Sequence, residues 1–218
     1  MMQLSAFLLL MLTSPVDQAS QSRDPAGFAF RESLQKAEQG NADAQEYVAL
    51  AYQYGLGVEC DEHAAIGWFE KAAAAGSAQA MSAIGIIFEQ RNDYTRAFDW
   101  YSRAAQARDA HAIYRLGIMY QEGWNVPRDR ARAVQLIEDA AWLDSSEAQH
   151  YLGLLYYKGE VVPKSYTRSY AWLNVAAPKG ARFLRTRDLV EKHLNAEQLA
   201  EAQKLSLEWA DRLKAVGK

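Results

Sequence analysis

Hydrophobic and small residues recur at helical spacing along most of the chain, and the pattern itself repeats. In the first recurring segment, an alanine is followed by an aliphatic residue, a small residue and an aromatic residue. Positions four residues apart lie on one face of a helix, so the alanine, the aliphatic residue and the aromatic residue of each segment predict a first helix with a buried stripe. The four versions are Ala44, Val48, Ala49 and Tyr52; Ala80, Ile84, Gly85 and Phe88; Ala112, Leu116, Gly117 and Tyr120; and Ala148, Leu152, Gly153 and Tyr156.

A second segment, of the form Ala-x-x-Trp-aromatic-x-x-Ala-Ala, alternates with the first. It occupies residues 65–73 and 97–105, and weaker copies occupy 133–141 and 169–177. Its bulky position steps from residue 68 to 100, 136 and 172, which is typical of a repeat array. A side chain suited to N-capping precedes every predicted helix: Asn41, Ser77, Asp109 and Ser145 for the first helices, and Asp61, Asp93, Asp129 and Ser165 for the second. The sequence therefore predicts stacked helix-turn-helix repeats.

Three of the four first helices carry a glycine at one position, at residues 85, 117 and 153. Glycine inside a helix costs about 1 kcal/mol relative to alanine, so its reuse predicts a neighbouring helix that passes too close for a side chain. We expect the Ala-Ala pair of the second helix to face it, with Trp or Leu alongside. In the loops, Gly57 and Asn125 suit one turn with positive φ, whereas Val161 predicts a different turn in the fourth repeat.

These patterns divide the chain into an N-terminal region, a repeat region and a tail. The expected segments are a signal peptide at 1–20, a linker at 21–27, a half-repeat cap at 28–40, repeats at 41–76, 77–108, 109–144 and 145–180, and capping helices at 181–218. In the tail, an amphipathic helix over 181–194 precedes a second helix that begins at a capping box formed by Asn195 and Gln198. The expected apolar faces include Leu184 and Leu189 in the first helix and Leu207 in the second. The tail is expected to cover the last repeat, and partner binding is its alternative role.

An apolar run at residues 4–12 is the basis for the expected export to the periplasm or cell envelope. Its length suits a secretory signal and is too short to span a bilayer. No Lys or Arg precedes the run, and Asp17-Gln18-Ala19 matches a cleavage site poorly. The alternative is an intracellular adaptor in which the run is part of the fold.

The repeated motifs resemble the Sel-one-like (Sel1-like) repeat family over residues 28–180. The resemblance rests on Leu-Gly-x-x-Tyr at 116–120 and 152–156, on Gly-x-Gly-Val at 55–58 and on the Trp-containing segments. It implies an all-α fold, a right-handed α/α solenoid of about four repeats that acts as a protein-interaction scaffold. The departures are a shortened second repeat, Leu136 in place of an aromatic residue, and Pro178, which should end its helix near Ala177.

Composition and motifs argue against several other classes of function. The net charge of −3 disfavours nucleic acid, and the single cysteine, Cys60, cannot form an internal disulfide. No stretch is apolar for the 18 or more residues of a membrane span. The best candidate for a metal site or a hydrolase is Glu147 with His150, one helical turn apart, but no second ligand set accompanies them. We therefore expect no catalytic residues, cofactor or metal.

A partner-binding groove is the favoured hypothesis for function. In tetratricopeptide-like stacks the first helices line the concave side, and one aliphatic residue per repeat falls opposite the buried face. Acidic, amide and tyrosine side chains flank this row, Glu89 and Glu147 among the acids, so we expect a protein or peptide partner with apolar and basic residues. Packing between neighbouring first helices explains the row equally well. The predicted partner-binding residues are Glu46, Leu50, Tyr54, Ile86, Glu89, Tyr114, Ile118, Gln121, Leu154 and Tyr157.

Overall fold

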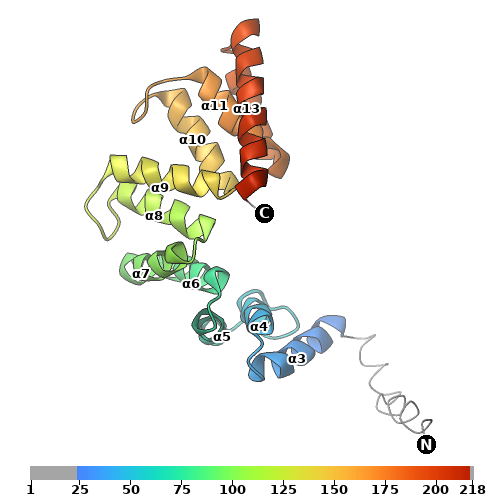
Figure 1. Cartoon of the computed structure of the whole chain (residues 1–218). Coiled ribbons are helices and arrows are strands. Elements are labelled where there is room, and N and C mark those ends of the chain that lie inside the picture. The colour runs from blue at the N-terminus through green and yellow to red at the C-terminus, as the bar shows by residue number, and fades with distance from the viewer. Residues whose placement is uncertain (1–23, 217–218) are drawn as a thin grey trace, which may run out of the picture. The chain divides into compact units, whose positions relative to one another are not determined.

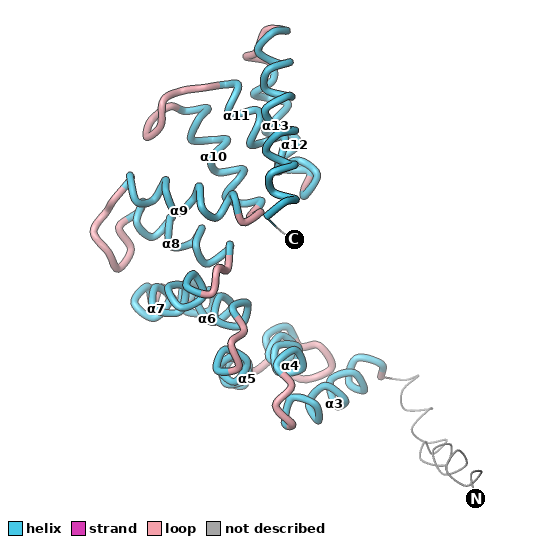
Figure 2. Tube along the Cα trace, viewed as in Figure 1, coloured by secondary structure: helices cyan, strands magenta, loops and turns pink. Residues whose placement is uncertain are grey.

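The computed structural model describes residues 24–216, and this part of the chain folds into helices and loops without a β-strand. The predicted signal peptide, 1–20, lies outside the described residues. The helices are α3 (Pro25–Glu38), α4 (Ala42–Tyr54), α5 (Glu62–Ala74), α6 (Ala78–Gln90), α7 (Tyr94–Gln106), α8 (Ala110–Glu122), α9 (Arg130–Trp142), α10 (Ser146–Lys158), α11 (Tyr166–Ala176), the 3-10 helix η1 (Ala177–Lys179), α12 (Ala181–Glu191) and α13 (Ala196–Val216), as Figures 1 and 2 show. The all-α fold class expected from the sequence is confirmed.

Two compact units make up the chain, and they divide within α6: one ends at Ala80 and the other begins at Met81. In the first unit α3 packs on α4, and α4 packs on α5. In the second unit α7 packs on α8, α8 on α9, α9 on α10 and α10 on α11. Each of these helices contacts its neighbour in sequence, which is the contact pattern of a repeat array.

The helices of the repeats begin where the capping residues predicted. In each case the side-chain oxygen of the capping residue accepts a hydrogen bond from the backbone N–H three residues later; the distance is 2.8 Å for Asn41 and 3.2 Å for Ser165. The full set is Asn41, Asp61, Ser77, Asp93, Asp109, Asp129, Ser145 and Ser165. The loop expectation also holds, since φ is 74° at Gly57 and 64° at Asn125, while Val161 is not among the positive-φ residues of the described chain.

The first helix, α3, starts earlier than the sequence suggested. It begins at Pro25 rather than at Phe28, so residues 25–27 are helical and do not belong to a linker. The side chain of Asp24 accepts a hydrogen bond from the Gly27 N–H at 2.9 Å. Proline suits the first position of a helix, where no N–H is needed and φ is already fixed. The stretch that resembled a linker is therefore a helix start.

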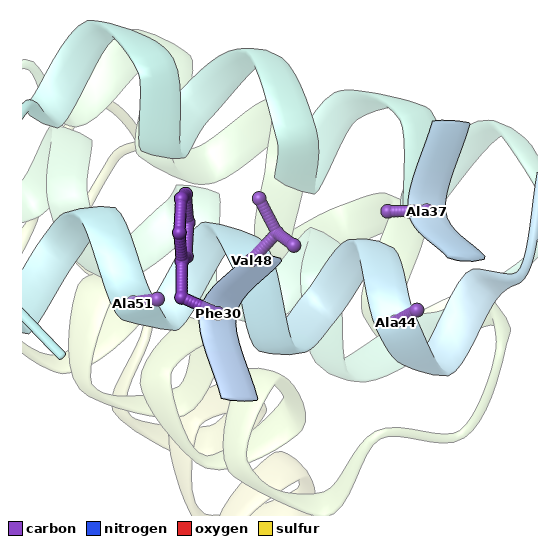
Figure 3. Close-up of a cluster of buried hydrophobic side chains, with 5 residues drawn as sticks. All are labelled: Phe30, Ala37, Ala44, Val48 and Ala51. Atoms are coloured by element: carbon purple, nitrogen blue, oxygen red, sulfur yellow. The ribbon is translucent and has the colours of Figure 1, made fainter. Parts of the chain in front are cut away.

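The same kind of buried hydrogen bond joins α4 to α3 and the first helix α10 to the second helix α9. The side-chain amide of Gln45 on α4 donates to the carbonyl of Ala37 on α3 at 3.1 Å, and Gln149 on α10 donates to Ala141 on α9 at the same distance. Phe30 and Ala37 of α3 share a core with Ala44, Val48 and Ala51 of α4 (Figure 3). Helix α3 thus contacts α4 as a second helix contacts the first helix that follows it.

Glycine in the first helices makes room for a side chain of the second helix. A Cβ atom at Gly85 would lie 2.6 Å from the ring of Tyr101, and one at Gly153 would lie 2.5 Å from Leu173. The same relation holds at Gly117, where the nearest atom belongs to Ile137 at 2.7 Å. The close approach is confirmed, but its partner is the residue after the Trp or Leu position, and not the Ala-Ala pair.

The tryptophans of the repeated segment differ in burial: Trp68 and Trp100 lie at the edge of the core, whereas Trp172 is buried within it. Trp68 and Trp100 are only half-buried, whereas the next residues, Phe69 and Tyr101, are 2% and 0% exposed. The ammonium of Lys71 lies 3.5 Å from the ring centroid of Trp68. In these two repeats the tryptophan therefore covers the edge of the core, and the following residue fills the core.

The tail packs on the last repeat, because α11 contacts both α12 and α13. Helix α11 ends at Ala176 beside Pro178, as expected, and α12 ends at Glu191 rather than at Leu194. The capping box is present: Gln198 N–H donates to the Asn195 side chain at 2.9 Å, and Asn195 N–H donates to that of Gln198 at 3.1 Å. Three leucines assigned to the apolar faces of the tail are instead exposed, namely Leu184, Leu189 and Leu207.

Candidate functional site

The predicted aliphatic row lies at the border between core and solvent. Leu50 is 38% exposed, and Ile86, Ile118 and Leu154 are half-buried. The residue after each row member is buried in every repeat: Ala51, Ile87, Met119 and Leu155. The following position therefore carries the internal packing, while each row residue keeps part of its side chain accessible.

In the first unit the row borders an apolar surface at the end of α4. Leu50 and Tyr54, one helical turn apart, are 38% and 64% exposed, and Leu56 in the following loop is 44% exposed. Glu46, one turn before Leu50, accepts a hydrogen bond from the hydroxyl of Ser77. The predicted carboxylate is thus engaged, while the apolar residues next to it are open to solvent.

In the second unit Glu89 belongs to an internal network. Its carboxylate forms an ion pair with Arg115, whose Nε lies 2.9 Å from Oε2, and the hydroxyl of Tyr101 donates to the same oxygen at 2.8 Å. Burial raises the pKa of the Tyr101 phenol and lowers the pKa of Arg115. Glu89 therefore links α6, α7 and α8, and its charge is already balanced.

Tyrosines connect α8 to α10 on the row side of the second unit. The rings of Tyr114 and Tyr151 meet edge to face with centroids 6.1 Å apart, and the Tyr151 hydroxyl donates to Gln121 at 2.6 Å. Burial, with the nearby Tyr151 and Glu147, raises the pKa of Tyr114 to about 12. A pocket of about 210 Å³ has Gln121, Tyr151 and Leu154 in its lining. The structure thus brings the predicted Gln121 and Leu154 together.

Tyr157, at the end of α10, lies against the tail. Its ring centroid is 5.6 Å from that of Tyr166 and 5.6 Å from that of His193, and its hydroxyl is 3.4 Å from His193 Nε2. The tail therefore restricts access to this predicted partner-binding residue.

Sequence reasoning missed Tyr151 and Arg115, which occupy the same helix position in successive repeats. They lie one turn before the row residues Leu154 and Ile118. The signal in the sequence was the repeat alignment. Large side chains occupy this position in three repeats, as Tyr47, Arg115 and Tyr151.

Glu147 and His150, the candidates for hydrolase or metal chemistry, are engaged by α12. Glu147 pairs with Arg182 at 3.2 Å, and His150 Nε2 lies 3.1 Å from the Thr186 hydroxyl. Burial, together with Arg182, lowers the pKa of His150. Among residues 24–216, no three His, Cys, Asp or Glu side chains gather as metal ligands. No described helix has the length and apolar character to cross a bilayer.

The packing of successive helix pairs, with their repeated caps and glycine contacts, defines a helical-repeat protein of the α/α solenoid class. The Sel1 repeat profile matches residues 42–77, 78–109, 110–141 and 146–180. These segments cover more than half of the chain, so the protein belongs to the Sel1 repeat family. The resemblance inferred from the sequence is confirmed.

Three solved structures illustrate the relationship. A protective antigen present in uropathogenic Escherichia coli strains, which displays an SLR fold, is 32% identical over 84% of this chain with a TM-score of 0.75; the chain spans only 41% of the antigen's length. A Sel1 repeat protein from Oxalobacter formigenes is 27% identical, with 88% of this chain and 80% of that protein covered and a TM-score of 0.70. An immunity protein from Pseudomonas aeruginosa shares the fold at 18% identity, with coverage of 86% and 76% and a TM-score of 0.57. No curated protein sequence matches the chain.

Proposed function

We propose that the protein is a non-catalytic scaffold that binds a protein or peptide segment on the accessible side of its first helices. Sel1 repeat proteins generally act as protein-interaction scaffolds. The observation that carries the proposal is the exposure of apolar residues on this side, above all Leu50 and Tyr54 in the first unit. In the second unit the half-buried Ile86, Ile118 and Leu154 offer further apolar contacts.

The apolar part of the expected partner has more support than the basic part. Aliphatic and tyrosine side chains supply contact area at low entropic cost. Two of the acids expected to attract basic residues, Glu89 and Glu147, already face arginines. We therefore assign the recognition on the first helices chiefly to apolar anchors of the partner.

Site-specific photo-cross-linking in the native cells tests this assignment. A cross-linker at position 118 should capture a protein that a cross-linker at position 207 does not, since Leu207 is 67% exposed on the tail helix α13 and is not part of the row. The purified partner should then bind Ile118→Glu and Leu50→Glu at least about tenfold more weakly, a loss of about 1.4 kcal/mol. Leu207→Glu is the matched control. Equal affinity of all variants, with circular dichroism unchanged, would contradict the proposal.

Export to the periplasm or cell envelope remains part of the proposal, motivated by the apolar run at 4–12. Mass spectrometry of the protein from fractionated cells provides the test. We expect the envelope fraction to hold a chain shortened near residue 20, whereas an intact N-terminus in the cytosol would favour the intracellular adaptor.

A further inference from the structure

A pocket in the second unit is lined by residues of α9, α11 and α13 and by Tyr156 of α10. It encloses about 520 Å³, within the roughly 300–1,000 Å³ of typical ligand sites. Its lining includes no residue of the aliphatic row, so it is distinct from the proposed first-helix surface. The residues that concern its chemistry are Glu138, Trp142, Arg168, Trp172, Glu201 and Trp209.

Three tryptophans from three helices form one wall of this pocket. The ring centroids of Trp172 and Trp209 are 4.4 Å apart, and those of Trp142 and Trp172 are 4.9 Å apart. The plane of Trp142 makes angles of 69° and 75° with the planes of Trp172 and Trp209. The rings therefore pack against one another: Trp172 is only 4% exposed, and the half-buried Trp142 and Trp209 supply most of the accessible aromatic surface.

Cations of the protein itself already use the rings around this pocket. The guanidinium carbon of Arg212 lies 4.0 Å from the ring centroid of Trp142, and that of Arg168 lies 5.6 Å from the ring centroid of Tyr156. Aromatic faces attract cations because their π-electrons place negative charge there. The electrostatic character of the wall therefore favours positive charge.

Two carboxylates complete the pocket, Glu138 from α9 and Glu201 from α13. Within the described part of the chain neither forms a hydrogen bond or an ion pair, although Glu138 is half-buried. Burial, with Asp139 next in the chain, raises the pKa of Glu138, while Arg168 opposes this effect. A partly desolvated carboxylate without a partner is stabilised by a cation that enters the pocket.

We propose that this pocket binds the side chain of a lysine residue presented by a protein partner. The ammonium group would be held by Glu138 and Glu201, and the apolar stem would lie on the half-buried Trp209. A lysine fits better than an arginine because its charge is compact, whereas a planar guanidinium prefers to stack on one ring. The site adds a charge-specific contact on a second face and does not depend on the first-helix row.

Nuclear magnetic resonance of the full chain, ¹⁵N-labelled at the indole nitrogens, tests the proposal. The probe is Nα-acetyl-lysine methylamide, and its uncharged match is Nα-acetyl-norleucine methylamide. The lysine probe should shift the signals of Trp142, Trp172 and Trp209 saturably and leave Trp68 and Trp100 unchanged. The norleucine probe should bind at least about fivefold more weakly. Absence of saturable shifts, or equal binding of both probes, would overturn the proposal.

Two substitutions that remove charges of opposite sign should change the affinity for the lysine probe in opposite directions. Glu138→Gln should weaken lysine binding at least about threefold, whereas Arg168→Gln, which removes a competing cation, should strengthen it. Glu70→Gln on α5, an exposed glutamate, is the matched control and should change nothing. Tighter binding of Nα-acetyl-arginine methylamide would exclude lysine selectivity, and tighter binding of Nα-acetyl-glutamate methylamide would make Arg168 the recognition group. Each of these two results overturns the proposal without affecting the cross-linking test at Ile118.

Discussion

At the scale of single residues, neighbouring positions of the repeated segment have different roles. Tyr101 and Leu173 are fully buried and fill the space left by a glycine, whereas Trp100 lies at the edge beneath Arg103, whose guanidinium carbon is 4.1 Å from the ring centroid. Consecutive residues of a helix point about 100° apart. When both are large and apolar, the sequence alone does not show which of them faces the adjacent helix.

Gly153 provides a test of this contact. Gly153→Ala places a Cβ atom 2.5 Å from Leu173, so we expect a loss of about 1–3 kcal/mol in the free energy of unfolding. Gly67 is a helical glycine with nothing within 4 Å of the added Cβ, and Gly67→Ala should stabilise by up to about 1 kcal/mol. Urea unfolding followed by circular dichroism measures both. Equal effects of the two substitutions would show that the close approach does not constrain Gly153.

At the scale of helices, the sequence predicted those features that depend on nearby residues. The eight repeat caps and the Asn195 capping box are local hydrogen bonds, and all of them form. The faces of the tail helices were harder to predict. Leu189 and Leu207 fit an amphipathic pattern but are 60% and 67% exposed, because the packing of α11 against α12 and α13 selects which stripe is covered.

Substitutions at Trp209 and Leu207 test which face of α13 packs on the rest of the second unit. Trp209→Ala removes the contacts with Trp142 and Trp172, so we expect a loss of about 1.5–3 kcal/mol. Leu207→Ala, two residues away on the exposed side, should change the free energy of unfolding by less than about 0.5 kcal/mol. Thermal and urea unfolding provide the comparison. A similar loss for both would mean that the tail packs by a different face.

At the scale of the whole molecule, the candidate sites depend on contacts between helices. The helical periodicity predicts where the aliphatic row lies, but it does not predict whether the flanking acids form ion pairs. Glu89 meets Arg115 from α8, and Glu147 meets Arg182 from α12. Those partners lie in neighbouring helices, so the pattern within one helix gives no information about them. For the same reason, the sequence did not predict the pocket lined by α9, α11 and α13.

Burial of tyrosines makes the stability of the second unit sensitive to alkaline pH. The pKa values of Tyr101 and Tyr151 are raised by burial, and that of Tyr114 is raised to about 12 from an ordinary value of 10.0. The folded state therefore holds the phenol protons more tightly than the unfolded state. This contribution to stability is fully present below about pH 10 and is lost as the pH rises toward about 12.

Two phenylalanine variants separate ionisation from hydrogen bonding. The hydroxyl of Tyr114 forms no hydrogen bond within the described chain, so Tyr114→Phe should change stability at pH 7 by less than about 0.5 kcal/mol. Between pH 10 and 12 it should lose less stability than the parent protein, because one titrating phenol is gone. Tyr101→Phe removes the bond to Glu89 and should already cost about 1.5–3 kcal/mol at pH 7. Urea unfolding at pH 7, 10 and 11 measures these differences, and the comparison with the parent cancels the titration of lysines common to both. If Tyr114→Phe loses stability as steeply as the parent above pH 10, ionisation of Tyr114 is not part of alkaline unfolding.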